Sequence, residues 1–387
     1  MEVLAQEPIK HGLVLSGGGA RAAYQVGCLR YMATAFPQYR PQILTGVSAG
    51  AINAAHLAAF RGSWADAVAV LSELWLSMET EKVYATHFSS VLRRVLTWGL
   101  HLLTGGRVGM DLRGMVDNRP LQEFLADALP SVDGRLLGID ENLKAGVLES
   151  LAIITTDYGV GRSIAWVQGG HESLGRAGQL QVEEVQLGLQ HILASAALPL
   201  FFPAVNLHDH WHGDGGVRLT APLSPAMHLG ANRILAVSPR SQPTQPLPAA
   251  LRAPYPSPAR IAGVLLNAVF LDMLDFDALQ MQRINRLLSR LPPTQRAGYR
   301  DVQVLVLRPR ADLGLLAREH QLMLPPAFRF FERGLQNEDD GAADALSMVI
   351  FEPAYIELLM RLGEEDSAAR HDEIEAFLRG SGDERAD

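Results

Sequence analysis

Two short apolar runs, each followed by a glycine-rich turn and a helix-compatible stretch, open the chain. The first run covers 13–15 and is followed by three glycines and a predicted helix over 20–32. The second unit has a predicted strand over 43–45, a turn over 46–50 and an alanine-rich helix to residue 60. Strand–turn–helix units in succession predict a parallel sheet with helices packed on it.

Later segments extend this pattern. Apolar residues at helical spacing predict a helix over 64–77, and the runs 151–156 and 163–167 flank two glycines and predict a hairpin. The runs 234–238 and 302–307 are typical of buried strands.

Seven prolines between residues 239 and 258 mark a connector. Because the strand over 302–307 lies beyond it and needs neighbours, we expect that strand to join the first sheet. The sequence therefore predicts a main α/β domain over 8–240, a connector over 241–258 and a helical extension over 259–363. An acidic tail over 364–387 follows.

Charge is distributed unevenly over the 387 residues. The net charge is −8, but residues 337–387 alone hold 15 acids and four arginines, so the remaining chain is slightly basic. No basic stripe is present, which argues against nucleic acid as a partner. In the tail we expect at most one helix, over 372–379.

Cysteine content and hydropathy bear on location. The single cysteine, Cys28, excludes an internal disulfide and fits a reducing compartment. The first residues lack the pattern of a secretory signal, and the uncharged stretches 41–60 and 185–207 contain polar or proline breaks. We expect a cytoplasmic protein, with peripheral membrane contact as an addition.

The pentapeptide GVSAG at 46–50 lies between the second predicted strand and its helix. G-x-S-x-G in this context predicts a nucleophile elbow that presents Ser48 above the sheet edge, at the positive end of a helix dipole. The alternative is an ordinary small-residue turn, and the flanking strand and helix favour the elbow.

The triplet Gly17-Gly18-Gly19 forms the first strand-to-helix turn. Bare backbone N–H groups in such a loop suit an oxyanion hole or an anion cradle. With Ala22 the triplet also satisfies the dinucleotide fingerprint G-x-G-x-x-A, but no Asp or Glu lies between Glu7 and Asp66 to bind a ribose. A phosphate-binding P-loop is excluded because no G-K-[ST] follows.

A third motif, Asp214-Gly215-Gly216, places a carboxylate on a tight turn after an apolar segment. On its own it is most simply an ordinary Asp-Gly turn. Its possible chemical role depends on the other two motifs.

In combination the motifs resemble the patatin-like phospholipase family. The resemblance rests on these segments, in family order: GGGAR at 17–21, GVSAG at 46–50, ASAALPLFFPAV at 194–205, DGG at 214–216, VLVLRP at 304–309 and, more weakly, ALSMVIFEPAYIELLMRLG at 345–363. It implies a three-layer α/β/α fold with a mainly parallel central sheet, a patatin-like catalytic domain over 8–240 and a helical C-terminal extension.

The resemblance also implies a catalytic dyad. Ser48 matches the nucleophile, Asp214 the general base, and Gly17, Gly18 and Gly19 the oxyanion hole. Arg21 matches a basic residue that either holds the loop or binds a substrate phosphate. Neither a cofactor nor a metal is implied. Because a carboxylate is a weak base for serine, Asp214 would need a poorly solvated position.

Two other site chemistries remain open. An α/β-hydrolase triad needs an acid and a histidine after the serine, and later histidines exist, but Ser48 follows only one earlier strand. His208, His210 and His212 would share a face with Asp214 in an extended strand and could bind a metal. The alternative for 206–212 is a hairpin whose turn scatters these side chains.

Residues 88–103 form an amphipathic pattern with Trp98 on the apolar side and two arginines on the other. A helix of this kind suits an anionic lipid surface, so we expect peripheral membrane contact here; the alternative is a cap helix over the core. The two roles are compatible.

The function expected from the resemblance is a serine acyl hydrolase that cleaves carboxylic ester bonds of phospholipids, lysophospholipids or acylglycerols. A lipid ester is then the expected substrate. The alternatives are a soluble esterase or thioesterase of the same fold, and a non-enzymatic lipid-binding protein. The presence of both Ser48 and Asp214 argues against the last of these.

Overall fold

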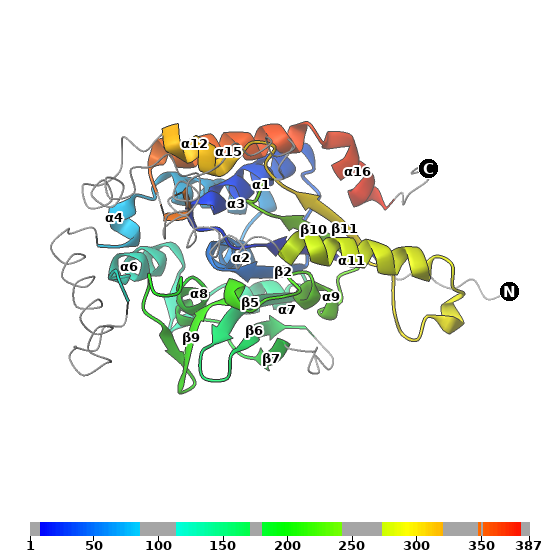
Figure 1. Ribbon diagram of the computed structural model, residues 1–387, viewed down its shortest axis with the longest axis horizontal. Coiled ribbons are helices and arrows are strands. Elements are labelled where there is room, and N and C mark those ends of the chain that lie inside the picture. Colours follow the sequence, from blue (N-terminus) through cyan, green and yellow to red (C-terminus); the bar gives the residue numbers. More distant parts are fainter. Residues whose placement is uncertain are drawn as a thin grey trace, which may run out of the picture.

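A nine-stranded, mostly parallel sheet forms the middle layer of the protein (Figure 1). The computed structural model describes residues 8–85, 114–170, 180–241, 273–319, 347–349 and 351–380. The strands are β1 (His11–Leu15), β2 (Ile43–Val47), β5 (Ser150–Asp157), β6 (Arg162–Gly169), β7 (Leu180–Glu184), β8 (Val205–Leu207), β9 (His210–Asp214), β10 (Arg233–Val237) and β11 (Gln303–Leu307). A separate two-stranded sheet pairs β3 (Ser131–Val132) with β4 (Arg135–Leu136).

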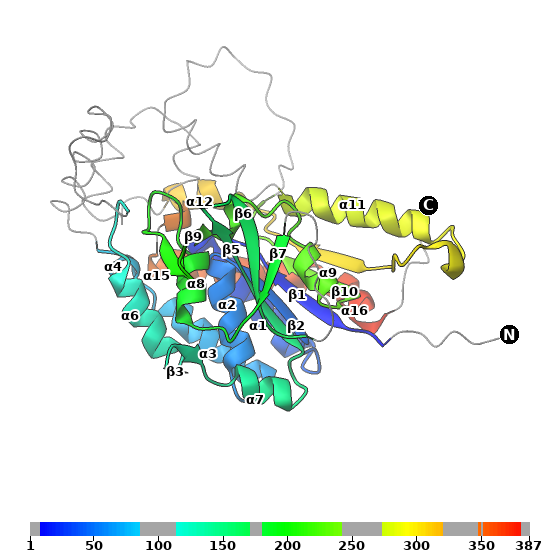
Figure 2. The same cartoon turned by 90° about the horizontal axis from the view of Figure 1, so that it is seen from below.

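The strand order β11-β10-β1-β2-β5-β6-β7 places the N-terminal strands in the middle of the sheet. Figure 2 shows β1 and β2 (blue) between strands from later in the chain. The pairs from β11 through β5 are parallel, β5 and β6 form the predicted antiparallel hairpin, and β9 pairs antiparallel with β5. The predicted mainly parallel sheet is confirmed, and β11, which follows the connector, lies in it.

Helices cover both faces of the sheet. Alternation along β1 explains this, because Leu13 and Leu15 belong to one core cluster while Val14 belongs to another. The first cluster packs against α1 (Ala23–Ala35), α2 (Ala49–Ala59), α3 (Trp64–Leu76) and α15 (Pro353–Ala368). The second packs against α9 (Ser224–His228) and α11 (Met273–Leu288).

Smaller helices lie around this frame. They are α4 (Thr80–Val83), α6 (Arg119–Ala128), α7 (Ile139–Lys144), α8 (Leu189–Ser195), α12 (Leu313–Glu319) and α16 (His371–Arg379), with 3-10 turns at Gly19–Ala22, Gly215–Val217 and Pro293–Gln295. Among the described residues no helix is long and apolar enough to cross a membrane.

The C-terminal helices share the core of the N-terminal units. Tyr355, Ile356 and Leu359 of α15 are fully buried in the cluster that contains α1, and Figure 1 shows the two helices side by side. A Cβ at Gly27 of α1 would collide with the backbone carbonyl of Met360, so only glycine allows this close crossing. The division of the chain into domains stays a prediction, but these helices are packed as part of the core.

The last two helices overlap the predicted acidic tail. The acidic tail was expected to hold at most one helix over 372–379; α16 occupies that place, while α15 also continues past residue 364 to Ala368. The connector over 241–258, apart from residue 241, and the amphipathic segment 88–103 lie outside the described residues.

Candidate active site

Ser48 occupies the turn between β2 and α2, as the sequence predicts. Its φ of 56° and ψ of −130° lie in a region that favours glycine, and such backbone strain costs about 1–3 kcal/mol. Ser48 is the N-cap of α2, yet its hydroxyl makes no capping hydrogen bond. The oxygen is therefore available at the positive end of the helix.

The glycine loop lies directly against this turn. A Cβ at Gly17 would lie 3.0 Å from the Cβ of Ser48, and a Cβ at Gly50 would lie 2.6 Å from the carbonyl oxygen of Ser16. The glycines of both motifs therefore allow two backbones to come together. No backbone hydrogen bond among the described residues uses the N–H of Gly17, Gly18 or Gly19, so these donors remain available.

Asp214 reaches the site at the end of β9. Its side chain is fully buried, Oδ1 accepts the N–H of Gly216 at 2.9 Å, and Oδ2 has no hydrogen-bond partner among the described residues. Burial raises the pKa of Asp214 from 3.8 to about 7, while the nearby Ser48 hydroxyl and the Gly216 N–H act to lower it. None of the described hydrogen bonds with ordinary geometry joins the two side chains, although the Ser48 hydroxyl acts on the pKa of Asp214.

The last residue of α8 and the turn that follows it support both of these residues. The Ser195 hydroxyl accepts the backbone N–H of Ser48 at 3.0 Å and donates to Ile154 O at 2.6 Å. Two residues later, the carbonyl of Ala197 accepts the N–H of Asp214 at 3.0 Å. Sequence reasoning gave Ser195 no role, although it lies in the segment 194–205 that supports the resemblance.

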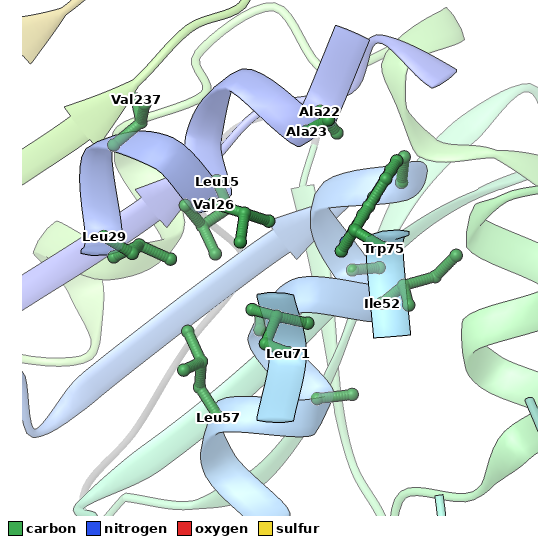
Figure 3. Packing of buried hydrophobic residues seen from close by; sticks show 14 of the residues in the cluster. Leu15, Ala22, Ala23, Val26, Leu29, Ile52, Leu57, Leu71, Trp75 and Val237 are labelled. Atoms are coloured by element: carbon green, nitrogen blue, oxygen red, sulfur yellow. The ribbon is translucent and has the colours of Figure 1, made fainter. Parts of the chain in front are cut away.

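An apolar pocket with about 620 Å³ of open space begins at Ser48. The described residues that line it are Gly18, Gly19, Ser48, Ala49, Ile52, Trp75, Met78, Val83, Leu121, Ala196, Leu198, Phe201, Phe202, Met348, Val349 and Phe351. None of them is a histidine or carries a charge. Figure 3 shows Ile52 of α2 and Trp75 of α3 within the core that backs this pocket.

The wall beside the glycine loop comes from the far end of the chain. A Cβ at Gly19 would collide with the carbonyl of Met348, so the backbone of 347–349 lies against the loop. Tyr84 donates to Val349 O at 2.8 Å and holds this segment in place. The weaker C-terminal part of the sequence resemblance therefore contributes to the pocket.

Arg21 is buried, with 3% of its surface exposed, and its Nε donates to Ser347 Oγ at 2.6 Å. Of the two roles expected for it, this contact favours holding the loop. Binding of a substrate phosphate by Arg21 stays a prediction.

The histidines upstream of Asp214 lie on one hairpin, where His208 and His212 both pack edge-on against Trp166. β8 and β9 form the expected hairpin, with His208 and Asp209 at positive φ in its turn. His210 pairs with Asp157 at 3.0 Å, and His212 contacts Thr155 Oγ1 at 3.1 Å. Over the described ranges no group of three or more His, Cys, Asp or Glu side chains could hold a metal ion.

Comparison with protein families matches residues 13–227 to the family described as patatin-like phospholipase, more than half of the chain. The chain belongs to this family. No curated protein matches it significantly.

Two solved structures show a distant likeness, each at 14% sequence identity. Human GIVD cytosolic phospholipase A2 has a TM-score of 0.46, with 96% of this chain and 59% of that chain covered. VipD from Legionella pneumophila has a TM-score of 0.35, with 91% and 67% covered. The chain thus spans about three fifths of the length of the human enzyme.

Proposed function

We propose that the protein is a lipid acyl hydrolase that uses Ser48 as nucleophile and Asp214 as general base. The observation that carries the proposal is the position of Ser48: a strained serine between a glycine loop and a buried carboxylate, at the mouth of an apolar pocket. Such a pocket suits the acyl chain of an ester.

In the proposed reaction the Ser48 hydroxyl attacks the ester carbonyl and its proton passes to Asp214. The N–H groups of Gly17, Gly18 and Gly19 stabilise the negative oxygen of the tetrahedral intermediate. Collapse expels the alcohol, which takes the proton from Asp214 and leaves an acyl group on Ser48. Water, deprotonated by Asp214, then attacks the acyl carbon, and the fatty acid leaves as Ser48 Oγ takes the proton back from Asp214.

The raised pKa of Asp214 supports its assignment as the base. A general base works best when its pKa lies near the working pH, because it is then both ionised and basic. At a pKa of about 7, Asp214 is a far stronger base than an ordinary carboxylate.

Labelling with a serine-reactive fluorophosphonate, followed by mass mapping, tests the proposal. We expect one label, on Ser48, and hydrolysis of a panel of phospholipids, lysophospholipids, acylglycerols, thioesters and short soluble esters. A preference for long acyl chains supports a lipid substrate, and a preference for short esters or thioesters contradicts it. Absence of both label and turnover would leave a lipid-binding protein.

Membrane contact through residues 88–103 stays a separate prediction. Liposome flotation of the full chain against a variant with Arg93 and Arg94 replaced by Glu tests it. Equal flotation of the two proteins would contradict it.

A further inference from the structure

A chain of three buried side chains links the pocket wall to the start of the glycine loop. Trp75 Nε1 donates to Asn53 Oδ1 at 2.6 Å, Asn53 Nδ2 donates to Gln25 Oε1 at 3.0 Å, and Gln25 Nε2 donates to Ser16 O at 2.7 Å. All three side chains are fully buried. None of the three belongs to a recognisable sequence motif.

The direction of these hydrogen bonds is determined at both ends. The indole of Trp75 can only donate, so Asn53 must present its oxygen to it and its NH₂ group to Gln25. The carbonyls of Ser16 and Val237 can only accept, so Gln25 must present its NH₂ group to them, at 2.7 and 3.3 Å. The two requirements agree, and the network therefore has a single orientation.

The carbonyl held by Gln25 belongs to the peptide that opens the glycine loop. Because a trans peptide is planar, holding Ser16 O also fixes the direction of the Gly17 N–H in the same plane. The close approach of Gly50 to Ser16 O restricts this peptide from a second side. Three successive glycines have great conformational freedom, so their donors need such external support to be preorganised.

Resting on the proposed function, we infer that Gln25 is a positioning residue for the oxyanion hole. Asn53 and Trp75 tie it to the wall of the acyl pocket. Gln25 touches no substrate; it acts through the Ser16–Gly17 peptide. Because Trp75 lines the pocket, the same network joins the surface that contacts the acyl chain to the loop that stabilises the transition state.

Gln25→Met, which keeps the length of the side chain and removes its hydrogen bonds, is the first test. We expect kcat on the best ester of the panel to fall about 10- to 100-fold with KM within about twofold, since the lost interaction acts in the transition state. The rate of fluorophosphonate labelling should fall in parallel. Unchanged kcat, or a loss in KM alone, would overturn the inference.

Gln25→Glu separates positioning from simple packing. The new carboxyl still accepts from Asn53, and when protonated it can donate to Ser16 O. None of the described hydrogen-bond partners of Gln25, which are Ser16 O, Val237 O and Asn53, carries a charge. We expect the ratio of kcat for this variant to kcat for wild type to fall as pH rises, because ionisation of the new carboxyl removes its donor; a ratio that is the same at every pH would contradict a positioning role.

Asn142→Leu is the matched control. Asn142 is also a buried amide that donates to two carbonyls, Ala58 O at 2.8 Å and Phe60 O at 3.0 Å, but at the opposite end of α2 from Ser48. The Asn142→Leu variant should be less stable than wild type but keep its kcat. An equal loss of kcat in Asn142→Leu and Gln25→Met would refute the inference. If wild type and Ser48→Ala hydrolyse equally, the proposed function fails instead, so the two failures are distinguishable.

Discussion

Two parts of the candidate site meet at Ser48 and differ in how their buried polar groups are satisfied. We call them the glycine-loop arm and the Asp214 arm. The glycine-loop arm has its polar groups joined by hydrogen bonds, from Trp75 through Gln25 to Ser16. The Asp214 arm buries a carboxylate that has one oxygen without a hydrogen bond from any described residue and a pKa raised to about 7. The hydrogen bonds of the glycine-loop arm keep its backbone rigid, as the proposed oxyanion-hole donors require. The burial of the Asp214 carboxylate destabilises its charged form, as the proposed base requires.

The largest expected effect comes from substituting Ser48, where the two arms meet. Ser48→Ala should lower ester hydrolysis by about 10⁴-fold or more, because no neighbouring group replaces the nucleophile. Turnover of the preferred ester, together with far-UV circular dichroism to confirm the fold, measures this. Retained turnover would remove Ser48 from the mechanism.

Asp214→Asn, the corresponding change in the electrostatic arm, should lower kcat about 10²- to 10⁴-fold. In wild type, kcat/KM should rise with pH around a midpoint of about 7, since the base must lose its proton to act. A pH–rate profile of both proteins measures the effect. A profile with no midpoint between about 6 and 8 would show that Asp214 is not the base.

The same substitution should stabilise the fold at high pH. A pKa raised from 3.8 to about 7 means that the folded state binds the proton more tightly, so stability is lost as pH rises through this range. Asp214→Asn removes that loss and should raise the free energy of unfolding at pH 8 by up to about 4 kcal/mol. Urea unfolding at pH 8 and pH 5 tests this, and the gain should shrink at pH 5.

A smaller loss of activity is expected at Ser195, which supports both arms. Ser195→Ala removes the acceptor of the Ser48 N–H and should lower kcat about tenfold and stability by about 1–3 kcal/mol. Ser150→Ala is the matched control, because Ser150 is equally buried and its Oγ has no described partner. Similar effects in both variants would show that only burial, not position, matters at Ser195.

The smallest expected effect concerns backbone strain. Ser48→Gly and Ser48→Ala both lack the nucleophile, but glycine adopts a φ of 56° without penalty. Ser48→Gly should therefore be about 1 kcal/mol more stable than Ser48→Ala by urea unfolding. Equal stability would mean that the turn relaxes when the side chain is removed.

Local sequence was enough to predict several of the elements and to propose three parts of the candidate site. The two strand–turn–helix units, the hairpin and the later strands follow from apolar runs separated by glycine. Ser48, Asp214 and the glycine triplet could be proposed from the sequence because the chemistry expected of them needs short, local motifs. Ser195, Gln25 and Asn53 were not, since a buried amide or hydroxyl has no pattern of its own and gains its meaning only from the carbonyl or N–H that it contacts.

By itself, the sequence determined which backbone turns can approach closely, because glycines and alternating apolar residues encode that locally. Only the tertiary structure decided which groups meet there. Parallel strand order brings β1 beside β2 and β10, β9 crosses onto β5, and residues 347–349 close the pocket from more than three hundred positions beyond the glycine loop. The raised pKa of Asp214 likewise arises from burial by the whole fold, a property that no segment of the chain has alone.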